Sequence, residues 1–243
     1  TQMVWDDDLN WEGGYQQVEW QAGSNVTIRL VAVETAITEV SADADTFMAA
    51  GYGQLSLQLG AHAFEFSVAD YGFGRVDQVA IGNATGPLKS INTNRVERDA
   101  TGNVTGFASD FNLVDVIGQV TLATTRPDYP LRLLVDWVTN TRAVGDAETG
   151  IWVEAEYGRA ARPTTYAVGY TLARIEQDAV LSPFVFSDMP GSNLWLHMVE
   201  ASYMPQPRLN LDLTLHFSKR LVVTPGASNT WLLSPHLAVR IGF

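Results

Sequence analysis

The stretch that decides the fold is residues 209–218, which read Leu-Asn-Leu-Asp-Leu-Thr-Leu-His-Phe-Ser. Leu or Phe occupies every second position, and polar or charged residues occupy the positions between them. Successive side chains of a β-strand point to opposite faces, so this alternation gives a strand with one apolar and one polar face. About ten residues is also the length at which a tilted strand crosses a bilayer. The stretch therefore predicts a membrane-spanning β-strand.

The same alternation recurs along most of the chain. Eleven segments are predicted to be strands, at residues 15–21, 26–39, 46–60, 62–74, 112–125, 131–142, 148–159, 164–177, 194–204, 209–221 and 231–243. Eleven is odd, whereas bacterial single-chain barrels have even numbers of strands. We therefore expect either another strand in residues 1–14 or further strands upstream of Thr1. The acidic run Asp6-Asp7-Asp8 argues against the first possibility.

The connections between these segments alternate in length. Short turns are expected at residues 21–25, 60–61, 126–130, 160–163 and 205–208. Connections of more variable length are expected at residues 40–45, 75–111, 143–147, 178–193 and 222–230. Short periplasmic turns that alternate with longer outer loops are typical of outer-membrane barrels. The longest connection, 75–111, is predicted either to fold into the lumen as a constriction or to remain outside as a loop.

The predicted fold class is all-β, in the form of a transmembrane, antiparallel, up-and-down β-barrel. Residues 1–243 are expected to form a single barrel domain with about 12 strands, as part of a barrel of about 16 strands. A soluble β-sandwich or lipocalin-like barrel is the alternative, but its exposed face would carry many Lys and Glu residues. Here that face carries mainly small and uncharged polar residues. Aromatic residues at the expected membrane boundaries also favour a membrane barrel: Trp20, Tyr71, Trp137, Tyr157, Tyr203 and Trp231.

Composition narrows the possible functions. Charged residues make up 17% of the chain, below the roughly 25% of ordinary soluble domains. The net charge of −12 argues against a nucleic-acid partner, which needs a basic surface. The absence of cysteine excludes disulfides, thiolate metal sites and cysteine nucleophiles.

The chain ends in Leu-Ala-Val-Arg-Ile-Gly-Phe, residues 237–243. Phe243 is a terminal aromatic residue, and Ile241 and Val239 precede it at alternate positions. This pattern resembles the C-terminal signal that the barrel-assembly machinery reads in outer-membrane proteins. The alternative is a strand that ends in Phe by chance.

Two further stretches carry a family resemblance. Residues 5–13 read Trp-Asp-Asp-Asp-Leu-Asn-Trp-Glu-Gly, and residues 169–180, Gly-Tyr-Thr-Leu-Ala-Arg-Ile-Glu-Gln-Asp-Ala-Val, lead into Phe186-Ser187-Asp188. With the strands between them, these stretches resemble the C-terminal barrel portion of a family of bacterial outer-membrane porins. The resemblance implies passive diffusion by a homotrimer and carries over no catalytic residues. Outer-membrane lipid is the expected partner of the barrel surface. In that family the first stretch lies well inside a longer chain, which again predicts missing upstream strands.

A porin needs a wet lumen lined by polar and charged side chains. The alternation places eleven such residues on the expected lumen side: Arg29, Glu65, Asp115, Arg132, Asp136, Glu154, Glu156, Asp212, His216, His236 and Arg240. Their acidic excess predicts a weak preference for cations, unless most of the negative charge lies on the outer loops. The small residues Ala167, Gly169 and Ala173 on the same side favour an open lumen. The second hypothesis is a closed barrel that anchors the envelope or a partner complex.

No enzymatic site is predicted. His216, Ser218 and Asn210 share one face, but an outer-membrane lipase site would have to face lipid, and these residues occupy the polar side. The four histidines, His62, His197, His216 and His236, have no zinc-site spacing. We therefore expect a porin of the bacterial outer membrane without metal or cofactor.

Overall fold

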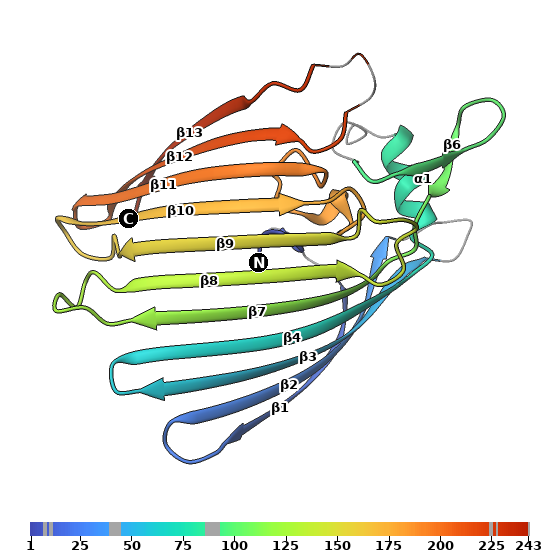
Figure 1. The fold of residues 1–243 in the computed structure, drawn as a ribbon. Coiled ribbons are helices and arrows are strands. Elements are labelled where there is room, and N and C mark those ends of the chain that lie inside the picture. The colour runs from blue at the N-terminus through green and yellow to red at the C-terminus, as the bar shows by residue number, and fades with distance from the viewer. Residues whose placement is uncertain are drawn as a thin grey trace.

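The computed structural model describes residues 1–6, 9, 12–38, 45–85, 93–223, 226 and 228–242. In this part of the chain, eleven strands form one antiparallel sheet in which each strand pairs with its neighbours in chain order (Figure 1). The strands are β1 (Glu12–Gln21), β2 (Val26–Thr38), β3 (Thr46–Leu59), β4 (His62–Gly74), β7 (Asn112–Leu122), β8 (Leu131–Asn140), β9 (Thr149–Gly158), β10 (Thr165–Ile175), β11 (Leu194–Gln206), β12 (Leu209–Arg220) and β13 (Leu232–Ile241). The all-β, antiparallel arrangement and all eleven predicted strands are confirmed.

The predicted alternation of connections is also confirmed. The turn end of the sheet carries residues 22–25, 60–61, 123–130, 159–164 and 207–208. The loop end carries residues 39–45, 75–111, 141–148, 176–193 and 221–231. At the turn end, Gly60 has φ of +61°, a left-handed conformation that lets β3 and β4 join through only two residues.

The connection 75–111 has secondary structure that the sequence analysis did not predict. It contains helix α1 (Asp77–Thr85) and a hairpin of β5 (Val96–Arg98) and β6 (Val104–Phe107), which lie at the loop end (Figure 1). Val79 and Ala80 of α1 and Phe107 of β6 are buried in the core. These elements are too short for a clear periodic signal, and burial against the end of the sheet stabilises them. A second short helix, η1 (Ser182–Phe184), lies in residues 176–193.

The curved sheet has two chemically different faces. In the paired register, Asp136, Trp152, Ala173 and Leu196 form one row across four strands on the same face. We call this the inner face, because the N-terminal residues 1–5 pack against it. Thr1 donates a hydrogen bond to Asp136 through its hydroxyl group, and Trp5 contacts Tyr71 at 5.3 Å between ring centroids.

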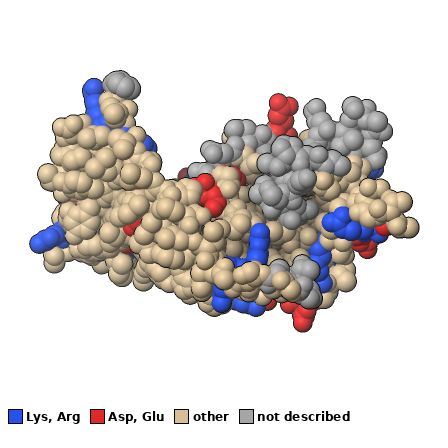
Figure 2. All heavy atoms as spheres, turned by 90° about the horizontal axis from the view of Figure 1, so that it is seen from above, with Lys and Arg blue, Asp and Glu red and all other residues tan. Residues whose placement is uncertain are grey.

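The outer face is apolar and widely exposed. Val135 is 48% exposed, Leu55 is 44% exposed and Leu237 is 77% exposed. Within the described strands, the register places five Asp, Glu, Arg or Lys side chains on this face, all in the half nearer the loop end: Glu12, Glu34, Asp70, Arg174 and Lys219. The half nearer the turn end has none. Figure 2 shows that much of the surface seen from above is likewise uncharged.

The six aromatic residues predicted at the membrane boundary do not all lie on one face of the sheet. Trp20, Trp137, Tyr203 and Trp231 are exposed, and the register of the three that lie in strands places them on the outer face. Tyr71 was wrongly assigned to the boundary. Its register with Leu113 places it on the inner face, where its ring contacts Trp5.

The hydrophobic core occupies the inner face near the loop end. Met3 and Val180 have no exposed surface, and Leu181 is 1% exposed, so the N-terminal residues and residues 176–193 together cover this part of the sheet. Gly150 allows the approach of Met3, since a Cβ atom at this position would lie 2.9 Å from the Met3 sulfur. Ala173 is fully buried here, so its small side chain does not leave an open lumen.

The predicted closure of the sheet into a barrel is not observed. Among the described residues, β1 and β13 each pair with only one neighbour, so the sheet has two free edges. The described part of residues 1–11 contains no strand, so the twelfth strand is not found there. No helix in the described part of the chain is long and apolar enough to cross a membrane.

Residues 93–109 are fixed to residues 176–193 by a buried carboxylate. Asp178 is fully buried and accepts hydrogen bonds from Arg95 Nε at 2.7 Å and from the Ser109 hydroxyl at 2.8 Å. Arg95 donates a further bond to Asp178 from its backbone amide, at 3.0 Å. Asn94 reinforces the contact by donating to the carbonyl oxygens of Gln177 and Val180.

We expect Asp178→Ala to release this contact, because Arg95 and Ser109 lose their shared acceptor. The expected cost is about 2 kcal/mol, or roughly thirtyfold in the population of the opened segment. Limited proteolysis of residues 93–111 measures this opening. Asp146→Ala, which removes an exposed carboxylate from the β8–β9 connection, is the matched control. Equal cleavage rates in both variants would contradict the expectation.

Candidate functional site on the inner face

The register places all eleven predicted lumen residues on the inner face. They do not form one site. Ion pairs and burial divide them into separate groups along the sheet, and Glu65 of β4 stands apart from the others as an exposed carboxylate.

The largest group surrounds Arg132 on β8. The Arg132 guanidinium binds both Glu154 and Glu156 of β9, the second at 2.6 Å. Trp152 donates a further hydrogen bond from Nε1 to Glu154 Oε2, at 3.3 Å. Because Glu154 and Glu156 are two residues apart on one strand, they share a face and can hold one guanidinium between them.

Glu200 of β11 joins this group, although the sequence analysis did not single it out. The register pairs Gly169 of β10 with both Glu156 and Glu200. A Cβ atom at Gly169 would lie 3.6 Å from Glu200 Oε2, so the glycine leaves room for the Glu200 side chain to lie across β10. Both faces of β11 are largely apolar in sequence, so alternation within this strand alone gave no signal for Glu200.

A cavity of about 300 Å³ opens beside these charges. Its lining residues are Thr1, Gln2, Arg132, Leu134, Trp152, Glu154, Glu156, Met198 and Glu200. The lining therefore combines charged and apolar side chains.

Asp115 and Asp136 lie deeper on the inner face. They are 2% and 0% exposed, and each has one carboxylate oxygen without a hydrogen-bond partner among the described residues. The N-terminal residues cover this part of the sheet, so these two carboxylates do not face open space.

The remaining charged residues form pairs between adjacent strands. Arg240 of β13 donates two hydrogen bonds to Asp212 of β12, each at 2.9 Å. Arg29 of β2 binds Glu19 of β1 at 3.0 Å. Both pairs are at least partly exposed, so they contribute little to stability and mainly place alternating charges along the inner face.

The two histidines form a third pair. The rings of His216 and His236 lie at 5.0 Å between centroids, and His236 Nδ1 is 3.5 Å from Asp188 Oδ2. His216 is 4% exposed, and neither of its ring nitrogens has a hydrogen-bond partner within the described residues. In the described part of the chain, no group of three or more His, Cys, Asp and Glu residues could hold a metal ion.

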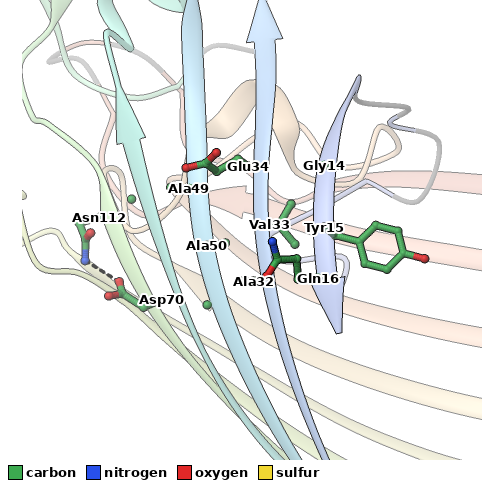
Figure 3. A pocket seen from close by; sticks show the side chains of 12 residues that line it. Gly14, Tyr15, Gln16, Ala32, Val33, Glu34, Ala49, Ala50, Asp70 and Asn112 are labelled. Carbon is green, nitrogen blue, oxygen red and sulfur yellow. Dashed lines mark hydrogen bonds between the residues drawn. The ribbon is translucent and has the colours of Figure 1, made fainter. Parts of the chain in front are cut away.

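A larger hollow of about 770 Å³ lies over β1–β4 (Figure 3). Glu34, Gln16 and Asp70 extend to one side of these strands, and Tyr15 extends to the other. Asp70 accepts a hydrogen bond from Asn112 at 2.7 Å. The carboxylates of this hollow belong to the outer face, so it is separate from the charged group around Arg132.

The chain matches no protein-family model, no curated protein and no solved structure. The resemblance to outer-membrane porins therefore stays a prediction from the sequence.

Glu176 holds the start of residues 176–193 to the sheet. Its Oε2 atom accepts hydrogen bonds from the backbone amide and the hydroxyl of Thr149, each at 2.9 Å, and its Oε1 atom accepts one from Arg174 at 2.8 Å. Burial acts to raise the pKa of Glu176, but these donors outweigh burial and hold the pKa below its ordinary value of 4.5.

The lowered pKa predicts acid sensitivity at this contact. An acidic group with a depressed folded pKa stabilises the folded contact above its unfolded pKa, and this contribution is lost as the pH falls through the folded value. We therefore expect residues 176–193 to become more mobile below about pH 4.5. Hydrogen exchange of this segment between pH 3 and pH 6 measures the effect. The Glu176→Gln variant should show the loosened state throughout this range, and an unchanged pH profile in it would refute the assignment.

Proposed function

We propose that the protein is a porin of the bacterial outer membrane, which lets ions and small hydrophilic solutes diffuse through a water-filled lumen. The observation that carries the proposal is the opposite chemistry of the two sheet faces. The outer face exposes apolar side chains and has no Asp, Glu, Arg or Lys residue in its turn-end half within the described strands. The inner face carries Arg132, Glu154, Asp212 and Arg240 in hydrogen-bonded groups. A soluble sheet would bury the apolar face and expose the charged one.

Closure of the barrel is part of the proposal. In hydrocarbon every backbone N–H and C=O group needs a partner, so a membrane sheet cannot keep free edges. The proposal therefore requires that the free edges of β1 and β13 be paired. A barrel of about 16 strands would satisfy both edges and leave an aqueous channel.

The proposed channel is narrow at the loop end and wide at the turn end. Residues 1–5 and 176–193 fill the inner face near the loop end, and the described residues 75–85 and 93–111 cap that end. The inner face of β1–β3 remains accessible, with Gln17 and Glu19 exposed and Arg29 and Gln54 partly exposed. These residues would line the wider part of the path.

Strand β13 presents apolar side chains on the outer face. Val239 and Ile241 are 56% and 61% exposed, and their register with Leu211 and Leu209 places them on the outer face. This orientation fits the proposed recognition by the barrel-assembly machinery; Phe243 lies outside the described residues. Contact with outer-membrane lipid and assembly as a homotrimer complete the proposal.

A closed structural barrel is the second candidate function. The dry packing of Met3, Val180 and Leu181 against the inner face favours it, because a lumen filled by side chains would not conduct.

Single-channel conductance in planar lipid bilayers separates the two candidates. We expect the detergent-purified full-length protein to give stable stepwise openings in groups of three, with a reversal potential that indicates a weak cation preference. A silent protein that still shows heat-modifiable gel mobility would be a closed barrel. Anion preference would contradict the proposed role of the acidic inner face.

Adjacent residues of β3 test the assignment of the outer face to lipid. Leu55 lies on the outer face and Ser56 on the inner face. We expect Leu55→Arg to destabilise the protein in vesicles by about 2–4 kcal/mol, because it places a cation in hydrocarbon. Ser56→Arg should be nearly neutral, since its register neighbour on β4 is Glu65.

Urea titration of protein folded into lipid vesicles measures both effects. Equal destabilisation by the two Arg variants would contradict the assignment of the outer face to lipid.

A further inference from the structure

Two carboxyl groups are buried together on the inner face, beneath the N-terminal residues. Asp115 of β7 pairs with Val138 of β8. Asp136 of β8 pairs with Ile117 of β7, so the two acidic side chains are diagonal neighbours on one face. A hydrogen bond joins the two carboxyl groups. Because an ionised carboxylate has no donor, this bond requires a proton on one of them.

The described residues do not compensate two negative charges at this place. Asp115 is 2% exposed and Asp136 is 0% exposed, and within the described residues no donor is found for the Oδ1 atom of either carboxyl group. Asp136 Oδ2 accepts a hydrogen bond from the Thr1 hydroxyl, and the Thr1 amino nitrogen lies 3.9 Å from the same oxygen. One cation cannot compensate two buried carboxylates, so the folded pair holds one proton.

Other titratable groups near the pair supply no further positive charge. Tyr71 of β4 and Tyr52 of β3 lie on the same face beside Asp115, and a phenol group contributes no cation. Arg132, further along β8, is already bound to two carboxylates of β9. Ionisation of both members of the pair would therefore leave a buried negative charge without compensation.

Residues 1–5 cover the pair and separate it from water. The Thr1 hydroxyl binds Asp136, Met3 has no exposed surface, and the ring of Trp5 contacts that of Tyr71 at 5.3 Å between centroids. A hydrogen bond also joins the side chains of Trp5 and Tyr71. Hydration of both carboxylates thus requires movement of this cover.

We propose that Asp115 and Asp136 share one proton and that loss of this proton releases residues 1–5 from the inner face. Release lets water solvate both carboxylates, so the released state binds one proton fewer than the packed state. A state that binds fewer protons is favoured as the pH rises. The consequence for transport rests on the proposed porin function: release would uncover the inner face near the loop end and widen the channel.

The test uses a nitroxide spin label at Gln2→Cys in the detergent-purified full-length protein, since the chain has no cysteine of its own. Electron paramagnetic resonance distinguishes a packed label from a mobile one. We expect the ratio of mobile to packed label to rise between about pH 6 and about pH 10. The rise should be at most about tenfold per pH unit, because one proton is linked to release. A ratio that does not change with pH would overturn the inference.

Two Asn variants of the labelled protein test the pair itself. Asp115→Asn removes one carboxyl group but keeps the side-chain shape, and its amide can donate to Asp136, so we expect the label to stay packed throughout this range. Asp136→Asn should behave alike, because its amide oxygen can still accept the Thr1 hydroxyl. Glu65→Gln, which removes an exposed inner-face carboxylate outside the pair, is the control and should keep the wild-type profile. Heat-modifiable gel mobility confirms folding, and a wild-type profile in either folded Asn variant would overturn the inference.

Channel recordings separate this inference from the porin proposal. In planar bilayers we expect the wild-type conductance to rise with pH over the same range, and that of Asp115→Asn to stay at its low-pH value. A label that becomes mobile in a protein without channel activity would support release of residues 1–5 but remove the porin proposal. Open channels combined with a label that stays packed at all pH values would overturn the inference and leave the porin proposal standing.

Discussion

Each strand sends successive side chains to opposite faces, so a shift of one residue between any two neighbours would exchange the faces of a strand. In the observed register, Arg132 of β8 meets Glu154 and Glu156 of β9, and Asp212 of β12 meets Arg240 of β13. The shifted register would move these charges to the apolar face and separate the partners. Correct pairing along eleven strands is therefore the constraint on which both the apolar outer surface and the charged inner groups depend.

The inner face has a dry part and a more open part, and segments outside the sheet create this difference. Residues 176–193 turn back over the sheet. The start of this segment is held in place by hydrogen bonds that Glu176 and Asp178 accept. Met3 and Val4 extend the same packed layer. Polar groups beneath this layer lose contact with water, as the burial of Asp115 and Asp136 shows. The proposed path for solutes therefore follows the accessible inner face of β1–β3.

The charged group around Arg132 depends on a residue that has no side chain. Gly169 separates Glu156 from Glu200 in the register, and a larger residue there would occupy space beside the Glu200 carboxylate. Glu200 can therefore approach a guanidinium that already has two carboxylate partners. This arrangement places three carboxylates and one guanidinium beside a small cavity.

The sequence by itself determined the strands, the alternation of short and longer connections, and the face of each predicted lumen residue. These properties follow from a period of two that acts over neighbouring residues, as in residues 209–218. Only the tertiary structure decided that Tyr71 packs against Trp5, that Asn94 binds the carbonyl of Gln177, and that Glu200 joins Arg132. These contacts join residues far apart in the chain, and local alternation does not specify which distant segments meet.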